Sequence, residues 1–258
     1  MLNVPVALRR SAVKRLVHAV WPPAQPRATS AIVDPPGLAS DLRRLFPDGA
    51  TTVFDVGAYK GEFAALIHGA FPAARVWCFE PFPASYQGIV TRFADQSWVQ
   101  VENYALSGQN GTAELMIGAD LSTNSMVSPV VNAGTFATDV PRIPVHVRTL
   151  SHCASELLGE EPSLSILKVD TEGNDLRVLE GGEDLLRAGR IDAVHVEVMF
   201  IEHFKGAPGF LEIGEYLQRF KYRLYSLYDL KRNPQGQLRY GNALFISPTR
   251  QAFAGIAR

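Results

Sequence analysis

The block FDVGAYKG, residues 54–61, places an acidic residue and two glycines where a predicted strand meets the next helix. In an open α/β sheet, ligands bind beyond the carboxyl ends of the strands, and a glycine turn lets a ligand approach the backbone. The candidate cofactor-binding residues here are Asp55, Gly57, Ala58 and Gly61. We expect the Asp55 side chain to face the bound molecule, which favours a cofactor with cationic groups.

A second predicted strand ends at Glu80. A carboxylate at this position can accept hydrogen bonds from both hydroxyls of a ribose. Nicotinamide-binding sites share this arrangement, but their fingerprint is G-x-G-x-x-G, and here only Gly57 and Gly61 are present. The pattern therefore disfavours a nicotinamide-dependent oxidoreductase.

Another acidic group follows the fourth predicted strand, which ends at Asp170 with Glu172 two residues beyond. On the fifth strand, His195 and Glu197 alternate with valines and therefore share one face. In one interpretation, Asp170, Glu172 or His195 is a catalytic residue that removes a proton from a substrate. In the other, Asp170, Glu172 and Glu197 bind a divalent cation such as Mg²⁺ or Mn²⁺. The sequence leaves both interpretations open.

The elements that must position these residues alternate between short β-branched or aromatic runs and amphipathic stretches. This alternation is typical of βαβ units and a mainly parallel sheet. The predicted strands are residues 51–57, 75–80, 98–107, 165–170 and 192–200, and the predicted helices are 61–71, 81–94, 176–188 and 209–220. Carboxyl ends of parallel strands lie on one edge, so Asp170 and Glu172 are expected beside the cofactor.

Two further pairs of strands are predicted to be antiparallel. Residues 111–118 and 143–150 flank a long polar loop, in which Ser122, Asn124 and Ser125 can bind sugar-like hydroxyls. The chain closes with a hairpin formed by residues 223–230 and 242–247. The predicted fold is thus α/β, with a doubly wound, mostly parallel sheet and a C-terminal antiparallel hairpin.

The N-terminal region differs in composition from the rest of the chain. Five basic residues precede the first acidic residue, Asp34, and five prolines lie between Trp21 and Gly37. We therefore predict a basic arm and Pro-rich linker over residues 1–37 and one folded domain over residues 38–258. The arm can rest on an anionic membrane surface, or pack on its own domain or a neighbour in a homo-oligomer.

Bulk composition excludes several classes of protein. The 258 residues carry a formal net charge of -1, which gives no overall attraction to nucleic acid. No apolar run reaches the roughly 18 residues of a membrane-spanning helix, and no signal peptide is evident. The two cysteines, Cys78 and Cys153, fit no metal-binding spacing and are expected to be reduced thiols. A soluble, cytoplasmic protein is expected.

A family resemblance is carried by LKVDTEGNDLRVLEGG, residues 167–182, which resembles the K-[IV]-D-x-E-G-x-[ED]-x-x-V-L-x-G signature of FkbM-type methyltransferases. FDVGAYKG, CFEP (78–81), ENYALSGQNGTAEL (102–115) and VHVEV (194–198) match the order and spacing of that family. Family members often have Asn where this chain has Tyr59. The matching blocks cover roughly residues 50–246.

The resemblance implies a class I, Rossmann-like methyltransferase that binds S-adenosylmethionine at the carboxyl edge of its first strands. Asp55, Gly57 and Gly61 would form the cofactor loop, Glu80 would bind the ribose, and Asn103 and Tyr104 would lie near the adenine, with Asp170 beside the sulfonium. The expected reaction is O-methylation of a hydroxyl on a saccharide, glycolipid or secondary metabolite. The alternatives are N-methylation and a non-catalytic nucleotide-binding module or partner subunit that retains the fold.

Overall fold

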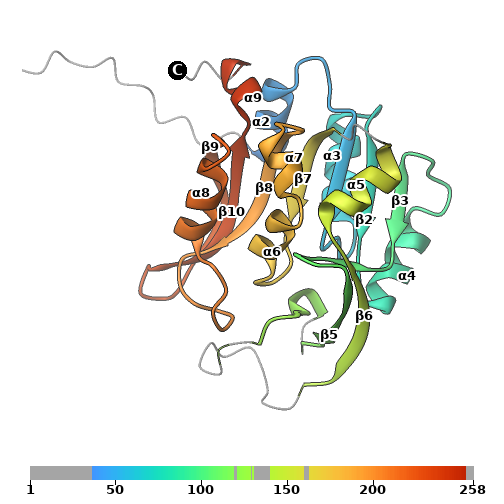
Figure 1. Ribbon diagram of the computed structural model, residues 1–258, viewed down its shortest axis with the longest axis vertical. Coiled ribbons are helices and arrows are strands. Elements are labelled where there is room, and N and C mark those ends of the chain that lie inside the picture. Colours follow the sequence, from blue (N-terminus) through green and yellow to red (C-terminus); the bar gives the residue numbers. More distant parts are fainter. Residues whose placement is uncertain (1–36, 119–120, 129, 131–139, 160–162, 254–258) are drawn as a thin grey trace, which may run out of the picture. The chain divides into compact units, whose positions relative to one another are not determined.

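The computed structural model describes residues 37–118, 121–128, 130, 140–159 and 163–253. Their main sheet has seven strands in the order β3-β2-β1-β7-β8-β10-β9 (Figure 1). The strands are β1 (Thr52–Val56), β2 (Arg75–Phe79), β3 (Val99–Glu102), β7 (Leu164–Val169), β8 (Ile191–Met199), β9 (Arg223–Arg232) and β10 (Leu238–Ile246). The first five are parallel to one another, and β10 runs antiparallel to both β8 and β9. The predicted doubly wound sheet with its C-terminal hairpin is confirmed.

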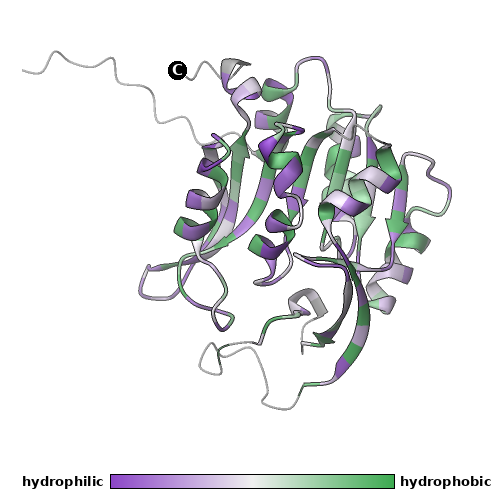
Figure 2. Ribbon diagram, in the orientation of Figure 1, coloured by the Kyte–Doolittle hydropathy of each residue, from purple (hydrophilic) through white to green (hydrophobic). Residues whose placement is uncertain are grey.

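Helices cover both faces of this sheet. The helices are α2 (Leu38–Leu45), α3 (Glu62–Ala70), α4 (Pro83–Arg92), α5 (Leu150–Leu158), α6 (Asp175–Glu180), α7 (Glu183–Arg187), α8 (Phe210–Gln218) and α9 (Pro248–Phe253). One apolar cluster joins α2, α3 and α4 to one face of the sheet, and another joins α5 to α8 to the other. The strands are accordingly hydrophobic along most of their length, as buried parallel strands are (Figure 2).

A second, three-stranded sheet is formed by β4 (Ala105–Leu106), β5 (Gly111–Met116) and β6 (Arg142–Arg148), in the order β4-β6-β5. The antiparallel pairing of β5 with β6 matches the prediction for residues 111–118 and 143–150. The chain enters this sheet directly after β3, which is the edge strand of the main sheet. It therefore extends the molecule beyond the carboxyl ends of β1, β2 and β7 (Figure 1).

Two local expectations were wrong, and one helix was not predicted. Residues 98–107 are not one strand, because the chain leaves the main sheet after Glu102 and β4 pairs with β6 instead. The helix predicted over 176–188 is interrupted at Gly181, where an added Cβ would lie 2.3 Å from the Ser107 carbonyl oxygen. Helix α5 was missed, although its N-cap Thr149 accepts a hydrogen bond from the His152 N–H, a recognisable start signal.

The predicted basic arm and most of the linker, residues 1–36, lie outside the described residues, as does much of the loop 119–144. The described chain begins at Gly37, and α2 begins at Leu38. Within the described ranges, no helix has both the length and the apolar character needed to cross a membrane.

Candidate functional site

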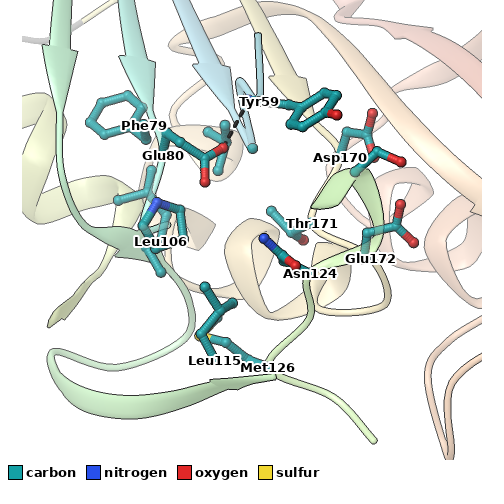
Figure 3. Close-up of a pocket in the computed structure, with 15 residues that line it drawn as sticks. Tyr59, Phe79, Glu80, Leu106, Leu115, Asn124, Met126, Asp170, Thr171 and Glu172 are labelled. Carbon is teal, nitrogen blue, oxygen red and sulfur yellow. Dashed lines mark hydrogen bonds between the residues drawn. The ribbon is translucent and has the colours of Figure 1, made fainter. Parts of the chain in front are cut away.

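A cavity of about 550 Å³, including its open mouth, lies where the loops after β1, β2 and β7 meet the second sheet. Its polar wall includes Gly57, Glu80, Asp170 and Glu172, whose side chains or backbone come from three strand ends (Figure 3). The apolar part of the wall is formed by Phe79, Leu106, Leu115 and Met126, and Phe79 and Leu106 lie beside Glu80 (Figure 3). The cavity can therefore hold a ligand with both a hydrophobic surface and charged or hydroxyl groups.

Strand register places the site residues in two rows across the same face of the sheet. Cys78, Asp55, Lys168 and His195 are direct neighbours on β2, β1, β7 and β8, and we call them the buried row. Two residues further along each strand lie Glu80, Gly57, Asp170 and Glu197, the rim row. Because side chains alternate between faces, the rim row stands directly above the buried row, about 6.6 Å closer to the sheet edge.

Gly57 begins the loop after β1 and has a φ of 74°, a conformation that favours glycine. An added Cβ would lie only 1.8 Å from the Asp170 carbonyl oxygen. The Gly57 and Ala58 N–H groups both donate to the Phe79 carbonyl, at 3.0 and 3.2 Å. The loops after β1 and β7 are thus in direct contact, and only glycine fits between them.

The Glu80 carboxylate lies on the cavity wall and is held by the backbone. It accepts hydrogen bonds from the Tyr59 N–H at 2.8 Å and from the Phe82 N–H at 2.9 Å. Burial raises the pKa of Glu80, while these two hydrogen bonds oppose that rise. Its position on the cavity wall is compatible with the predicted role in binding a ribose, because carboxylate oxygens retain acceptor capacity beyond these two bonds.

Asp55 does not face the cavity, and the expectation for its side chain is corrected. It belongs to the buried row, has no exposed surface, and forms an ion pair with Lys168 Nζ at 3.2 Å. Burial raises the pKa of Asp55, and the Lys168 charge lowers it. Any influence of Asp55 on a bound ligand must therefore act through Lys168 or through the loop above.

Asp170, Glu172 and Glu197 come together as predicted, with one carboxylate oxygen from each lying within 4.8 Å of the others. Glu197 Oε2 is buried without a hydrogen-bond partner among the described residues. Burial and the neighbouring Asp170 carboxylate raise the pKa of Glu197. Asp170 is the more accessible of this pair, with 37% of its side chain exposed. The cluster can accept a proton or bind a cation.

The loop that carries Glu172 is fixed by Asp175, the first residue of α6. Its carboxylate accepts hydrogen bonds from the Thr171 N–H at 2.9 Å, the Thr171 hydroxyl at 3.0 Å and the Gly173 N–H at 3.2 Å. Burial and the Asp170 charge raise the pKa of Asp175 to about 6. Asp175 therefore organises the loop after β7, and Glu172 takes up a positive φ of 53° within it.

His195 lies away from the cavity, which argues against its predicted role as a catalytic base. Its ring stacks on Phe63 of α3 at a centroid distance of 5.6 Å, and both ring nitrogens lack hydrogen-bond partners among the described residues. Burial, with a smaller effect of Lys168, lowers the pKa of His195 to about 3. The imidazole is thus neutral at ordinary pH and belongs to the buried row.

We expect His195 to make the fold sensitive to acid. The unfolded chain binds a proton on this residue as the pH falls through 6.5, whereas the folded chain excludes it until about pH 3. The free energy of unfolding should therefore fall between these two values. In thermal melts from pH 7 to 4, His195→Phe should lose less stability than the wild type. Parallel curves for the two proteins would contradict this expectation.

Four other predicted cofactor residues do not line the cavity, namely Ala58, Gly61, Asn103 and Tyr104. Asn103 Nδ2 donates to the Glu80 carbonyl at 2.8 Å, so it supports the end of β2. Tyr104 packs in the core on Phe79, with a centroid distance of 5.7 Å. Gly61 has a φ of 71°, and an added Cβ would lie 2.6 Å from the Phe93 ring, which indicates a packing role at the start of α3.

The described part of the long loop covers the acidic side of the cavity. Ser122 and Asn124 line the cavity as expected, and Asn124 Oδ1 accepts a hydrogen bond from the Gly118 N–H at 3.0 Å. Ser125 is buried instead, and its hydroxyl donates to the Glu172 carbonyl at 2.6 Å. Ser125 thus attaches the loop to the protein, which leaves Ser122 and Asn124 as the candidates for contact with a substrate.

Two features of the site were not found from the sequence. Lys168 lies in the quoted signature, but only its place between Asp55 and Asp170 in the fold reveals its contacts. Leu115 and Met126 come from parts of the chain that precede β7, and no local pattern marks them as cavity residues. As apolar residues, Leu115 in β5 and Met126 in the loop after it are expected to be buried, and the sequence shows nothing more about their position.

Comparison with known proteins identifies the family. Residues 55–224 match the methyltransferase FkbM domain. Methyltransferase 1 of Beauveria bassiana (strain ARSEF 2860) is 28% identical over 156 residues, which cover 54% of this chain and 61% of that protein. The 31-O-demethyl-FK506 methyltransferase FkbM of Streptomyces tacrolimicus is 27% identical over 154 residues, 51% of this chain and 59% of that protein. The matches thus span about three fifths of these relatives.

Two solved methyltransferases resemble the chain more distantly. The 1,6-didemethyltoxoflavin-N1-methyltransferase of Burkholderia thailandensis, with S-adenosylhomocysteine bound, is 14% identical with a TM-score of 0.44, covering 95% of this chain and 93% of that one. Magnesium protoporphyrin IX methyltransferase of Synechocystis PCC 6803, with S-adenosylmethionine bound, is 7% identical with a TM-score of 0.47, covering 96% and 86%. The family match extends over more than half of the chain. This chain belongs to the FkbM methyltransferase family.

Proposed function

We propose that the domain transfers a methyl group from S-adenosylmethionine to a hydroxyl of a saccharide, a glycolipid or a secondary metabolite. The observation that carries the proposal is one cavity that joins the Gly57 loop and Glu80 to Asp170 and Glu172. The first pair suits the cofactor, and the second lies where an acceptor would meet the methyl group. The name of the Streptomyces tacrolimicus relative refers to a 31-O-demethyl substrate, which supports transfer to oxygen.

The site residues fit this cofactor by chemistry as well as by position. S-Adenosylmethionine supplies a methyl group on a cationic sulfonium, and the rim row offers carboxylates on either side of Gly57. Glu80 is oriented by two backbone N–H groups toward the cavity, as a ribose ligand requires. The apolar wall that includes Leu106 and Met126 can contact the adenine. Binding both partners in one cavity would align them for in-line displacement.

A hydroxyl acceptor must lose its proton, and the acidic cluster supports two routes. Asp170 can act as the general base, because its carboxylate lines the cavity and 37% of its side chain is exposed. Alternatively, Asp170, Glu172 and Glu197 can bind Mg²⁺ or Mn²⁺, which would acidify the hydroxyl. Glu197 Oε2 is buried and has no hydrogen-bond partner among the described residues, which supports the second route because a bound cation would supply the missing partner. N-methylation would need neither route.

Calorimetric titration with S-adenosylhomocysteine, with NAD as control, tests the cofactor without knowledge of the acceptor. Micromolar binding of the first alone is the expected result. Hydroxylated acceptors are then screened for methyl transfer, with and without Mg²⁺. Binding without turnover on any hydroxyl or amine acceptor would favour the non-catalytic module, and binding of NAD alone would overturn the proposal.

We expect Glu80→Ala to weaken binding of S-adenosylhomocysteine by about 1–3 kcal/mol, because charge-assisted hydrogen bonds to the ribose are lost. The matched control is Glu183→Ala, which removes a carboxylate from α7, where Glu183 pairs with Arg187. Calorimetry on both variants at the same pH measures the difference. Unchanged affinity of folded Glu80→Ala would remove the ribose assignment.

A further inference from the structure

Lys168 is a buried cation at the centre of the buried row, with only 8% of its side chain exposed. Its Nζ lies 3.2 Å from Asp55 Oδ1 and 3.6 Å from Asp170 Oδ2. It also donates to the Gly57 carbonyl at 2.6 Å and to the Val56 carbonyl at 3.3 Å. Burial alone would lower the pKa of Lys168, but the two carboxylates raise it above its ordinary value, so the side chain stays charged.

Stability of the fold does not explain this cation. Removing two charges from water is unfavourable by several kcal/mol per ion, and well-packed apolar residues often stabilise such a position equally well. The rest of the sheet follows the apolar rule, since Val53, Ile166 and Ala193 occupy the next row on the same face. Lys168 lies two positions further along the strand, directly below the loops, and its ammonium group contacts the Gly57 carbonyl, which points to a role in the loops themselves.

The contacts of Lys168 connect the two halves of the site. One contact fixes the peptide between Gly57 and Ala58, since its carbonyl is bound by Lys168 while its N–H is bound by Phe79. The orientation of this peptide is thereby fixed by a contact at each end. The other contact holds the Asp170 carboxylate, which faces the cavity on the neighbouring loop. One ammonium group thus touches both the cofactor loop and the acceptor side.

We propose that Lys168 is a positioning residue that fixes the Gly57 loop and Asp170 relative to each other, and so sets the alignment of methyl donor and acceptor. The proposal rests on the proposed methyl transfer. Lys168 does not line the cavity, so it acts through Gly57 and Asp170 rather than by touching a ligand. Misalignment of about 1 Å between reacting groups is enough to slow a reaction by roughly 100-fold.

The test compares Asp55→Asn with the double variant Asp55→Asn, Lys168→Met. Both lack the ion pair between these residues, but only the double variant lacks the ammonium group on Gly57 and Asp170. Replacing Asp55 in both variants also avoids the buried, unpaired carboxylate that Lys168→Met alone would leave. We expect the double variant to bind S-adenosylhomocysteine at least about tenfold more weakly than Asp55→Asn, as loss of a hydrogen bond to a charged group predicts.

Three further comparisons separate positioning from a general effect on folding. Tyr228→Phe removes the buried 2.7 Å hydrogen bond to Asp41 on the same side of the sheet, and should lower the melting temperature without changing cofactor affinity. With an acceptor from the screen, the double variant should lose more in kcat than it changes in the acceptor KM. Asp55→Asn, Lys168→Gln should recover part of the lost affinity, because the side-chain NH₂ group can still donate hydrogen bonds.

Equal cofactor affinity and kcat in Asp55→Asn and the folded double variant would overturn the proposal. If the Met variant shows no cooperative melting, the Gln variant replaces it in the same comparison, with equality to Asp55→Asn again the overturning result. Failure of the wild type to methylate any acceptor would overturn the proposed function instead. The affinity comparison would then still decide whether Lys168 positions the cofactor loop.

Discussion

Asp170→Asn should reduce methyl transfer by about 10²- to 10⁴-fold, the usual contribution of a positioned proton acceptor. Asparagine has nearly the same shape, so packing against Gly57 and the loop after β7 should persist. Affinity for S-adenosylhomocysteine should stay within about threefold, since one exposed carboxylate contributes little to binding of an uncharged thioether. The measurement is turnover on an acceptor from the screen, with the cofactor dissociation constant determined on the same preparation.

The matched control is Asp95→Asn, which changes an exposed carboxylate after α4 and should retain full turnover. Near-normal turnover in Asp170→Asn would exclude this residue both as the base and as an essential cation ligand.

Chelation of divalent cations separates the two routes of proton removal. Activity that survives EDTA supports the base, whereas activity lost to EDTA and restored by Mg²⁺ supports the cation. In the second case, Glu197→Gln should also weaken binding of Mn²⁺, measured directly by electron paramagnetic resonance.

Gly57→Ala is expected to abolish measurable cofactor binding and to lower the free energy of unfolding by about 3 kcal/mol or more. The added methyl group would lie 1.8 Å from the Asp170 carbonyl oxygen, and a backbone atom cannot rotate aside. The left-handed conformation is unfavourable for alanine by a further 1–2 kcal/mol or so. The loops after β1 and β7 must separate to make room. Chemical denaturation and calorimetry measure the two effects.

Gly69→Ala serves as the control for this variant. Gly69 lies in α3, and an added Cβ would meet no atom within 4 Å. Alanine there should raise the free energy of unfolding by roughly 0.5–1 kcal/mol, because it restricts the unfolded chain and favours the helix. Wild-type cofactor affinity in folded Gly57→Ala would show that the two loops do not need their close contact.

Residue patterning predicted the main sheet because most of its parallel strands are apolar on both faces and are followed by a helix. The ends of those strands could therefore be read directly, and Gly57, Glu80 and Asp170 were all placed at the cavity edge. Helix α5 and the break at Gly181 were missed for different reasons. The first has a readable cap at Thr149, whereas the second depends on contact with Ser107, far away in the sequence.

The sequence could not predict whether a polar residue near a strand end lies in the rim row or in the buried row. Alternation correctly placed His195 and Glu197 on one face, but they differ by two residues along β8. That step separates a rim carboxylate from a buried imidazole, and only the register between β7 and β8 shows which is which. Asp55 was misjudged for the same reason, because its pairing with Lys168 places it one row below the cavity.

Because β1 and β7 are adjacent in the sheet, one edge of β1 stays unpaired during synthesis of the nascent chain. These strands are neighbours in the sheet, yet Val53 and its partner Ile166 are separated in the sequence by about half of the folded domain. As the protein leaves the ribosome, β1 can pair with β2 but presents its other edge unpaired until residues beyond 164 emerge. An apolar strand with an open edge is prone to pairing with other chains. Nascent chains stopped before β7 should therefore need chaperone protection, and the cofactor can protect only the finished protein.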